Sequence, residues 1–267
     1  MRQLETTHSI LTRGGNKFHG RLMRQETVSM DEMTYLLGEY DVQDYGETVF
    51  SKEPVSENGK FRSARSMIPF EQLEKRAKDF DWILYGDDNP DTEKGRRMAN
   101  AFVLNFQKFR RDGKGLYIHS VTKGTGKTYL SYCLANEVMA RYDVNVKFTS
   151  VLEYLDLTKK GYSSAADKEE KDSILKASVL ILDDIGVEVS KEWVNTTLYQ
   201  LINYRYSNKL ITIITSNYPI EQLKVDDRIK DRINSMCLPL HIPEVSIRAM
   251  ETDRENSNFI KEVFGTK

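Results

Sequence analysis

Residues 119–128 read HSVTKGTGKT, and the last five, GTGKT, match the end of the phosphate-binding pattern G-x-x-x-x-G-K-[ST]. Glycines in such a loop let the backbone curl, so that successive N–H groups point at one cluster of phosphate oxygens. The helix that follows presents the positive end of its dipole to the same oxygens. Lys127 can supply a positive charge for the β- and γ-phosphates, and Thr128 can supply a hydroxyl for Mg²⁺. The segment therefore predicts a site for a nucleoside triphosphate.

One position departs from this pattern, because the expected first glycine is Val121. A β-branched residue disfavours positive φ, so we expect the loop to begin in an ordinary extended conformation. The alternative interpretation is a glycine-rich turn between a strand and a helix, with a chance Lys-Thr pair. The residues that we assign to nucleotide contact are Lys123, Gly124, Thr125, Gly126, Lys127, Thr128 and Tyr129.

Short apolar runs alternate with helical patterns around this loop. The predicted strands are 116–118, 144–148, 179–182, 210–215 and 237–242. The predicted helices are 70–80, 93–111, 127–141, 152–160 and 193–206. Since such alternation is typical of βαβ units, we expect an α/β fold with a five-stranded, mostly parallel sheet flanked by helices.

Two acids follow the continuous apolar run at 179–182, which reads as a buried parallel strand. Acids at the carboxyl end of such a strand lie where ligands bind in open α/β sheets. We expect Asp183 to bind Mg²⁺ together with Thr128. We expect Asp184 to orient or deprotonate an attacking water. The alternative is a pair of solvated acids at a strand end.

The composition is that of a folded globular protein, with 39% hydrophobic and 30% charged residues over 267 positions. The formal net charge of −1 argues against a protein that coats nucleic acid through bulk charge. The two cysteines, Cys133 and Cys237, form no metal-binding or disulfide pattern, so we expect a reduced, cytoplasmic setting. No apolar run approaches the ~18–20 residues of a membrane span, and we expect no membrane partner. Residues 1–10 are too polar for a signal peptide.

The charge at the start of the chain is uneven. Residues 1–25 hold five basic residues and one acid, whereas residues 26–50 hold seven acids and no Lys or Arg. Such blocks are typical of interaction segments or of solvated faces. We predict a helix beginning at Ser29 and a polar linker over 51–66. We therefore divide the chain into a partner-interaction region and linker, 1–66, and an α/β domain, 67–267.

Three further motifs carry a family resemblance. Asp-Asp-Ile-Gly at 183–186, Arg205-Tyr206 and Thr-Ser-Asn at 215–217 follow one another as in the bacterial helicase-loader ATPases of the DnaC/DnaI family. The chain resembles that family over roughly residues 70–248. The family belongs to the AAA+ class and the IstB-like ATP-binding superfamily, which implies a P-loop ATPase fold with ATP and Mg²⁺ as ligands. DnaI-type loaders also carry a zinc-binding N-terminal domain, which we do not expect here because the cysteines are missing.

The resemblance implies roles for individual residues. Asn217 is similar to the sensor-1 residue, whose amide holds the attacking water or a γ-phosphate oxygen. Residues 228–232, RIKDR, resemble the arginine-finger box, with Arg232 as our first choice for the finger and Arg228 as the second. Ser246-Ile247-Arg248 resembles the sensor-2 element S-Y-R, in which Arg248 contacts the nucleotide, although Ile replaces Tyr.

Each of these residues also has a simpler interpretation. Asn217 can be an ordinary residue at a strand end, and Arg248 an ordinary surface residue. Arg228 and Arg232 can instead pair with Asp226, Asp227 or Asp231 on a solvated helix.

The partners implied by the resemblance are a hexameric DnaB-type replicative helicase, single-stranded DNA and further copies of this chain, joined through an arginine finger that acts in trans. Residues 159–162, KKGY, combine charge with an aromatic ring that could stack on a base, although they also fit a solvated loop. The predicted function is ATP-dependent loading of the helicase. The alternatives are an IstB-type transposition helper ATPase and a nucleotide-gated binding module without hydrolysis.

Overall fold

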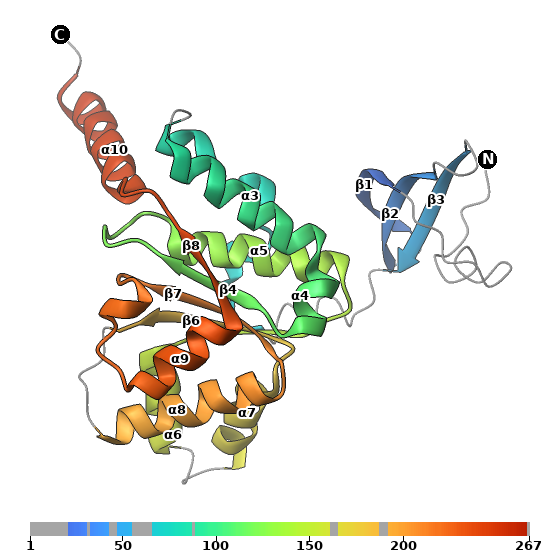
Figure 1. Cartoon of the computed structure of the whole chain (residues 1–267). Helices are drawn as coiled ribbons and strands as arrows, with labels where there is room; N and C mark the ends of the chain where they lie inside the picture. Colours follow the sequence, from blue (N-terminus) through green and yellow to red (C-terminus); the bar gives the residue numbers. More distant parts are fainter. Residues whose placement is uncertain are drawn as a thin grey trace, which may run out of the picture. The chain divides into compact units, whose positions relative to one another are not determined.

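A computed structural model describes residues 21–30, 33–42, 47–54, 66–86, 89–160, 165–186 and 192–265, with side chains described from residue 66 onward except at 160 and 165. The chain divides into two units, Met1–Ala64 and Arg65–Lys267, which we treat separately (Figure 1). No helix in these ranges is long and apolar enough to cross a membrane.

The first unit contains an antiparallel sheet of β1 (Arg21–Met30), β2 (Met33–Val42) and β3 (Glu47–Pro54), in that order. The helix predicted to begin at Ser29 is wrong, because Ser29 lies in β1 and pairs with Thr34 of β2. β-Branched and aromatic residues such as Val28 and Tyr35 favour cross-strand pairing, which outweighs the capping signal. The predicted linker begins too early as well, since β3 extends to Pro54, and residues 55–65 lie outside the described ranges.

The second unit is built on a five-stranded sheet in the order β5-β6-β7-β4-β8, and all its pairings are parallel. Its strands are β4 (Gly115–His119), β5 (Val146–Ser150), β6 (Val179–Ile185), β7 (Ile211–Ser216) and β8 (Cys237–His241). The predicted five-stranded parallel α/β fold is therefore confirmed. Because β4 lies between β7 and β8, the loop that follows it leaves the sheet close to the ends of both neighbours.

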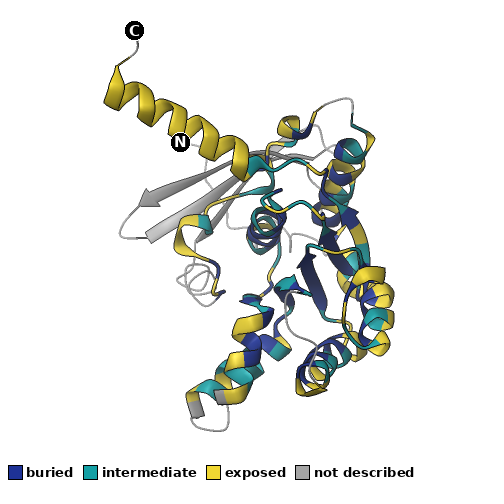
Figure 2. Cartoon of the chain, turned by 90° about the vertical axis from the view of Figure 1, so that its left-hand side faces the viewer, coloured by how far each residue is buried: buried dark blue, intermediate teal, exposed yellow. Residues whose placement is uncertain are grey.

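Helices cover both faces of this sheet (Figure 1). The helices are α3 (Pro90–Leu104), α4 (Phe106–Asp112), α5 (Lys127–Arg141), α6 (Val151–Lys160), α7 (Ala165–Lys176), α8 (Glu192–Ser207), α9 (Asp227–Met236) and α10 (Ile247–Phe264). Strand β6 separates two hydrophobic cores, because Val179 and Ile181 join the core beneath α3 and α5 whereas Leu180 and Leu182 join the core beneath α6 to α9. The strands are buried, and α10 is exposed along its length (Figure 2).

Of the two helices predicted before β4, the one over 70–80 is wrong and the one over 93–111 is divided. Residues 70–80 form short 3₁₀ turns, η1 (Phe70–Gln72) and η2 (Ala77–Asp79), followed by η3 (Trp82–Tyr85). The Arg76 backbone N–H donates to the Asp79 carboxylate over 2.7 Å, which begins a new turn rather than extending the first. Segment 93–111 is two helices, because the Asn105 side chain donates to the Ala101 carbonyl over 3.0 Å and ends α3 there.

Arg205 of α8 is completely buried, and among the described residues no carboxylate is a hydrogen-bond partner of its guanidinium. Its guanidinium donates to the Thr212 hydroxyl and to the carbonyls of Leu175, Ala177 and Ile211, at 2.6–3.0 Å. Burial lowers the pKa of Arg205 to about 9. The Arg205 guanidinium thus donates to carbonyls at the end of α7 and at the start of β7. These hydrogen bonds connect α8 with α7 and β7 in the core.

We predict that Arg205→Met lowers the free energy of unfolding by about 3–5 kcal/mol, because it leaves several buried carbonyls without donors. Urea denaturation of the full chain measures this loss. The matched control is Arg254→Met on the exposed face of α10, for which we expect a change within about 0.5 kcal/mol. Equal stability of the two variants would contradict the structural role of Arg205.

Candidate nucleotide-binding site

The loop between β4 and α5 curls through two glycines with left-handed backbone, Gly124 at φ 76° and Gly126 at φ 83°. A Cβ atom at Gly124 would lie 2.9 Å from the Ser246 hydroxyl, so this position has no room for a side chain. Val121 is not among the described residues with positive φ, and its side chain is exposed. The expectation that Val121 avoids positive φ is therefore confirmed.

Lys127 lies at the first position of α5, and its side chain is buried inside the loop. Its Nζ donates to the carbonyls of Ser120 and Thr122 at 3.2 and 3.0 Å, and to the Thr125 hydroxyl at 3.4 Å. Burial lowers the pKa of Lys127, whereas the nearby carboxylates of Asp183 and Asp184 favour its charged form. The ammonium group thus binds uncharged acceptors of the loop, which phosphate oxygens can replace.

Asp183, near the end of β6, receives two hydroxyl hydrogen bonds on the same carboxylate oxygen. Thr128 Oγ1 donates to Asp183 Oδ1 over 2.8 Å, and Thr215 Oγ1 donates to it over 2.6 Å. Burial raises the pKa of Asp183, and these two hydroxyls oppose that change. Hydroxyl and carboxylate oxygens are the hard ligands that Mg²⁺ prefers, so Thr128 and Asp183 fit a magnesium site.

Asp184 has a left-handed backbone with φ 62° and lies where the register between β6 and β7 shifts. Its N–H donates to Thr215 Oγ1 over 2.9 Å, and its carboxylate accepts a hydrogen bond from Asn217 Nδ2 over 2.9 Å. Aspartate tolerates this conformation better than most residues do. The irregularity separates the two acids, so that Asp183 contacts Thr128 while Asp184 contacts Asn217.

An aromatic segment before α3, which carries none of the predicted site residues, lies against the same loop. The Tyr85 hydroxyl donates to the Thr125 carbonyl over 2.6 Å, and the Phe80 ring stacks against Tyr85 with a centroid distance of 5.7 Å. Tyr129 also stacks on Phe80, and its hydroxyl donates to the Asp79 carbonyl over 3.4 Å. The dense aromatic run at 80–85, FDWILY, is the only sequence signal for this packing.

The predicted sensor-2 segment also lies beside the loop. The Arg248 N–H donates to the Gly124 carbonyl over 3.1 Å, so the start of α10 is next to the loop. Ser246 caps this helix, since its hydroxyl accepts a hydrogen bond from the Ala249 N–H over 3.3 Å. Lys123 is exposed in the loop.

The two candidate finger arginines lie on α9 and contact none of these residues. Arg228 forms two hydrogen bonds with the Asp226 carboxylate, at 3.0 and 2.9 Å, and its side chain is 66% exposed. Arg232 donates to the Asn203 side chain at 2.7 Å and to the Tyr199 hydroxyl at 2.9 Å. Within one chain the structure therefore joins Lys127, Thr128, Asp183, Asp184 and Asn217, but neither arginine.

The candidate DNA segment is only partly described. Lys159 Nζ lies 4.5 Å from the centre of the Trp193 ring and 3.6 Å from an Asp156 carboxylate oxygen. The side chain of Lys160, and all of Gly161 and Tyr162, lie outside the described residues. The suggestion that this segment stacks on a base stays a prediction.

Comparison with known proteins agrees with this geometry. The replicative helicase loader DnaI of Bacillus subtilis (strain 168) is 31% identical over 113 residues, covering 42% of this chain and 36% of DnaI. The loader DnaC of Escherichia coli (strain K12) is 25% identical over 144 residues, covering 52% of this chain and 55% of DnaC. A crystal structure of DnaI superposes with a TM-score of 0.56 at 30% identity, covering 66% of this chain and 95% of that chain.

The chain spans about half the length of the curated relatives it matches, or less. The sequence model of the IstB-like ATP binding protein family matches residues 107–251. That range is more than half of the chain, and it contains the P-loop, both acids of β6, Asn217 and both candidate finger arginines. With its AAA+ P-loop fold, the chain therefore belongs to the IstB-like ATP-binding family.

Proposed function

We propose that this protein uses ATP and Mg²⁺ to load a hexameric DnaB-type replicative helicase onto single-stranded DNA. The observation that carries the proposal is the convergence of Lys127, Thr128, Asp183, Asp184 and Asn217 at one edge of the sheet. Membership of an ATP-binding family, with helicase loaders among the relatives, supports the same function.

The proposed hydrolysis follows from these contacts. Residues 123–129 bind the phosphates, with Lys127 exchanging its carbonyl partners for phosphate oxygens. Thr128 and Asp183 hold Mg²⁺, which supplies charge neutralisation at the phosphates. Asp184 accepts the proton of the attacking water, while the Asn217 amide fixes the orientation of its carboxylate. Arg248 contacts the nucleotide from α10.

We propose that the finger comes from a neighbouring copy of the chain, so that the active form is a homo-oligomer. Of the two arginines, we propose Arg228 rather than Arg232 as the finger. Arg232 is committed to Asn203 and Tyr199 of α8 within its own chain. Arg228 has an exposed side chain, and its partners are the Asp226 carboxylate and the Tyr199 ring, whose centre lies 4.9 Å from its Cζ. It can exchange this surface carboxylate for a γ-phosphate at modest cost.

The partners are proposed from the relatives and from the sequence. DnaI and DnaC are replicative helicase loaders by name, and residues 1–66 carry the charge asymmetry suited to docking a helicase. Residues 159–162 are the proposed contact to single-stranded DNA, and the proposed location is the cytoplasm. A second candidate is a transposition helper ATPase, because the matching family model is the IstB type.

We predict that Lys127→Ala loses affinity for Mg²⁺-ATP, because the variant lacks the ammonium group that donates inside the loop. Asp184→Asn should keep the affinity and lower kcat by about 10²–10⁴-fold, since the amide cannot accept a proton. Nucleotide titration and phosphate release, measured with DNA and helicase present, separate the two effects. Lys108→Ala, an exposed change on α4, is the matched control. Unchanged phosphate release in both variants would instead favour a binding module without hydrolysis.

We predict that Arg228→Ala and Asp184→Asn are each inactive alone but recover activity when mixed. In a mixed assembly, an Arg228→Ala subunit keeps its Asp184 and receives Arg228 from an Asp184→Asn neighbour. ATPase activity against mixing ratio measures this recovery, and the expected effect of the missing finger is about 10³–10⁵-fold in rate. The same recovery with Arg232→Ala in place of Arg228→Ala would make Arg232 the finger.

We predict that the full chain co-purifies with a DnaB-type helicase and that a chain lacking residues 1–64, the whole of the first unit, does not. The shortened chain should still bind Mg²⁺-ATP, which serves as the control for its folding. Assembly on duplex DNA and capture of a transposase, without helicase binding, would support the transposition helper.

A further inference from the structure

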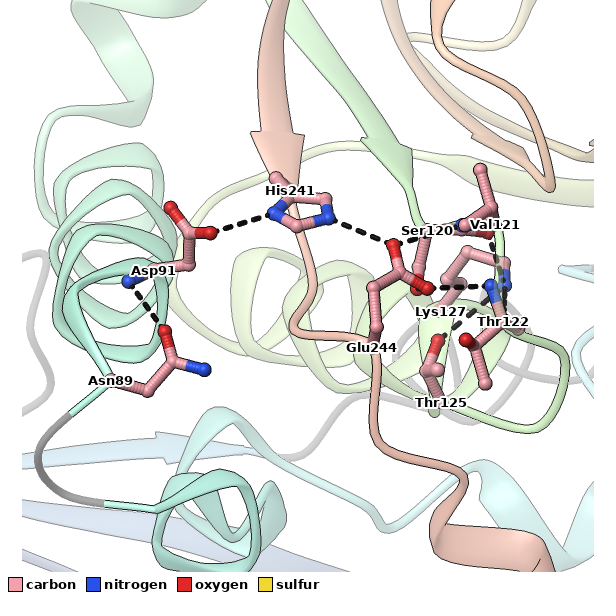
Figure 3. A network of polar contacts seen from close by, with 9 residues as sticks. All are labelled: Asn89, Asp91, Ser120, Val121, Thr122, Thr125, Lys127, His241 and Glu244. Carbon is pink, nitrogen blue, oxygen red and sulfur yellow. Dashed lines mark hydrogen bonds and ion pairs between the residues drawn. The ribbon is translucent and has the colours of Figure 1, made fainter.

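The chain that follows β8 runs alongside the P-loop. The Ile242 N–H donates to the His119 carbonyl over 2.9 Å just before the loop, and Arg248 contacts Gly124 further along. Glu244 lies between these two points, and none of the motifs discussed above includes it (Figure 3). Its carboxylate faces the entrance of the loop, where Val121 replaces the usual glycine.

Both oxygens of this carboxylate bind the loop backbone. Val121 N–H donates to Oε1 over 3.0 Å, and Thr122 N–H donates to Oε2 over 2.6 Å. The Ser120 hydroxyl donates to Oε2 over 2.9 Å. Glu244 therefore satisfies two successive amides and a hydroxyl that lie in the turn, outside any helix or strand.

The peptide units around Thr122 are held from two directions. The Thr122 N–H donates to Glu244, while its carbonyl accepts from Lys127 Nζ over 3.0 Å. The Glu244 carboxylate thus fixes the peptide plane before Thr122, and the Lys127 ammonium group fixes the peptide plane after it. These two hydrogen bonds fix the backbone conformation ahead of Gly124, and position 121 does not need a left-handed residue.

A histidine holds Glu244 in this position. His241 Nε2 lies 3.0 Å from Glu244 Oε1, and His241 Nδ1 lies 3.1 Å from Asp91 Oδ2 in the first turn of α3 (Figure 3). Although burial alone would raise it, the hydrogen bonds from His241, Thr122 and Ser120 lower the pKa of Glu244 to about 2. Glu244 is therefore a carboxylate acceptor at neutral pH.

We propose that Glu244 is a positioning residue for nucleotide binding, whose carboxylate holds the amides of Val121 and Thr122 and so keeps the P-loop open to phosphate. This inference rests on the proposed function, because it assumes that the loop binds a nucleotide. Glu244 itself does not touch the phosphates; it acts through the loop backbone.

Nucleotide affinity in three Glu244 variants of the full chain tests this inference. Glu244→Ala and Glu244→Gln should weaken binding of Mg²⁺-ATP and Mg²⁺-ADP by about tenfold, because an amide offers one acceptor where the carboxylate offers two. Glu244→Asp should retain more affinity than Glu244→Gln, since it keeps both oxygens. Glu251→Gln, an exposed change on α10, should leave the affinity unchanged.

A second measurement needs no nucleotide. Hydrogen exchange at the amides of Val121 and Thr122 should be faster in Glu244→Gln than in the wild-type chain, while exchange in β6 stays the same. Melting temperatures without nucleotide show whether each variant is folded.

Two results would overturn the inference alone: wild-type affinity in all three Glu244 variants, or better binding by Gln than by Asp, which indicates that side-chain size matters rather than charge. A wild-type chain that binds no nucleotide would overturn the proposed function as well, so the two failures are distinguishable.

Discussion

The hydroxyl of Thr215 joins the ends of β6 and β7, and the arrangement of the acids depends on it. It donates to the Asp183 carboxylate over 2.6 Å and accepts from the Asp184 N–H over 2.9 Å. The buried Thr215 hydroxyl on β7 thus fixes both the side chain of Asp183 and the backbone N–H of Asp184 on β6. The left-handed turn at Asp184 is stabilised by this contact, and Asp183 and Asp184 consequently meet different partners.

The sequence predicted those parts of the fold where one periodicity dominates. Helix α5 has the predicted limits 127–141, and β6 follows from an uninterrupted apolar run. Predictions failed where local capping competed with other interactions. The side chain of Asn105 ends α3 early, and strand pairing overrides the capping signal at Ser29. Whether capping or strand pairing prevails depends on residues that are close in space but distant in the sequence, and a local sequence pattern does not contain them.

The site was predicted unevenly for a related reason. Lys127, Thr128, Asp183 and Asp184 carry patterns readable over a few residues, and Asn217 follows a strand end. Glu244 contacts Val121 across 123 positions, and this contact exists only because β8 lies beside β4 in the sheet. Thr215 likewise acts across a strand pairing. No local pattern identifies such residues, because their role depends on strand order.

The charges around the loop give magnesium a further role in the proposed function. Lys127 is the cation inside the loop, and the carboxylates of Asp183 and Asp184 lie close enough to favour its charged form. A triphosphate entering beside these two carboxylates meets electrostatic repulsion. A divalent cation held by Thr128 and Asp183 would reverse the sign of that interaction. Nucleotide affinity and magnesium affinity should therefore be coupled, with each ligand strengthening the binding of the other.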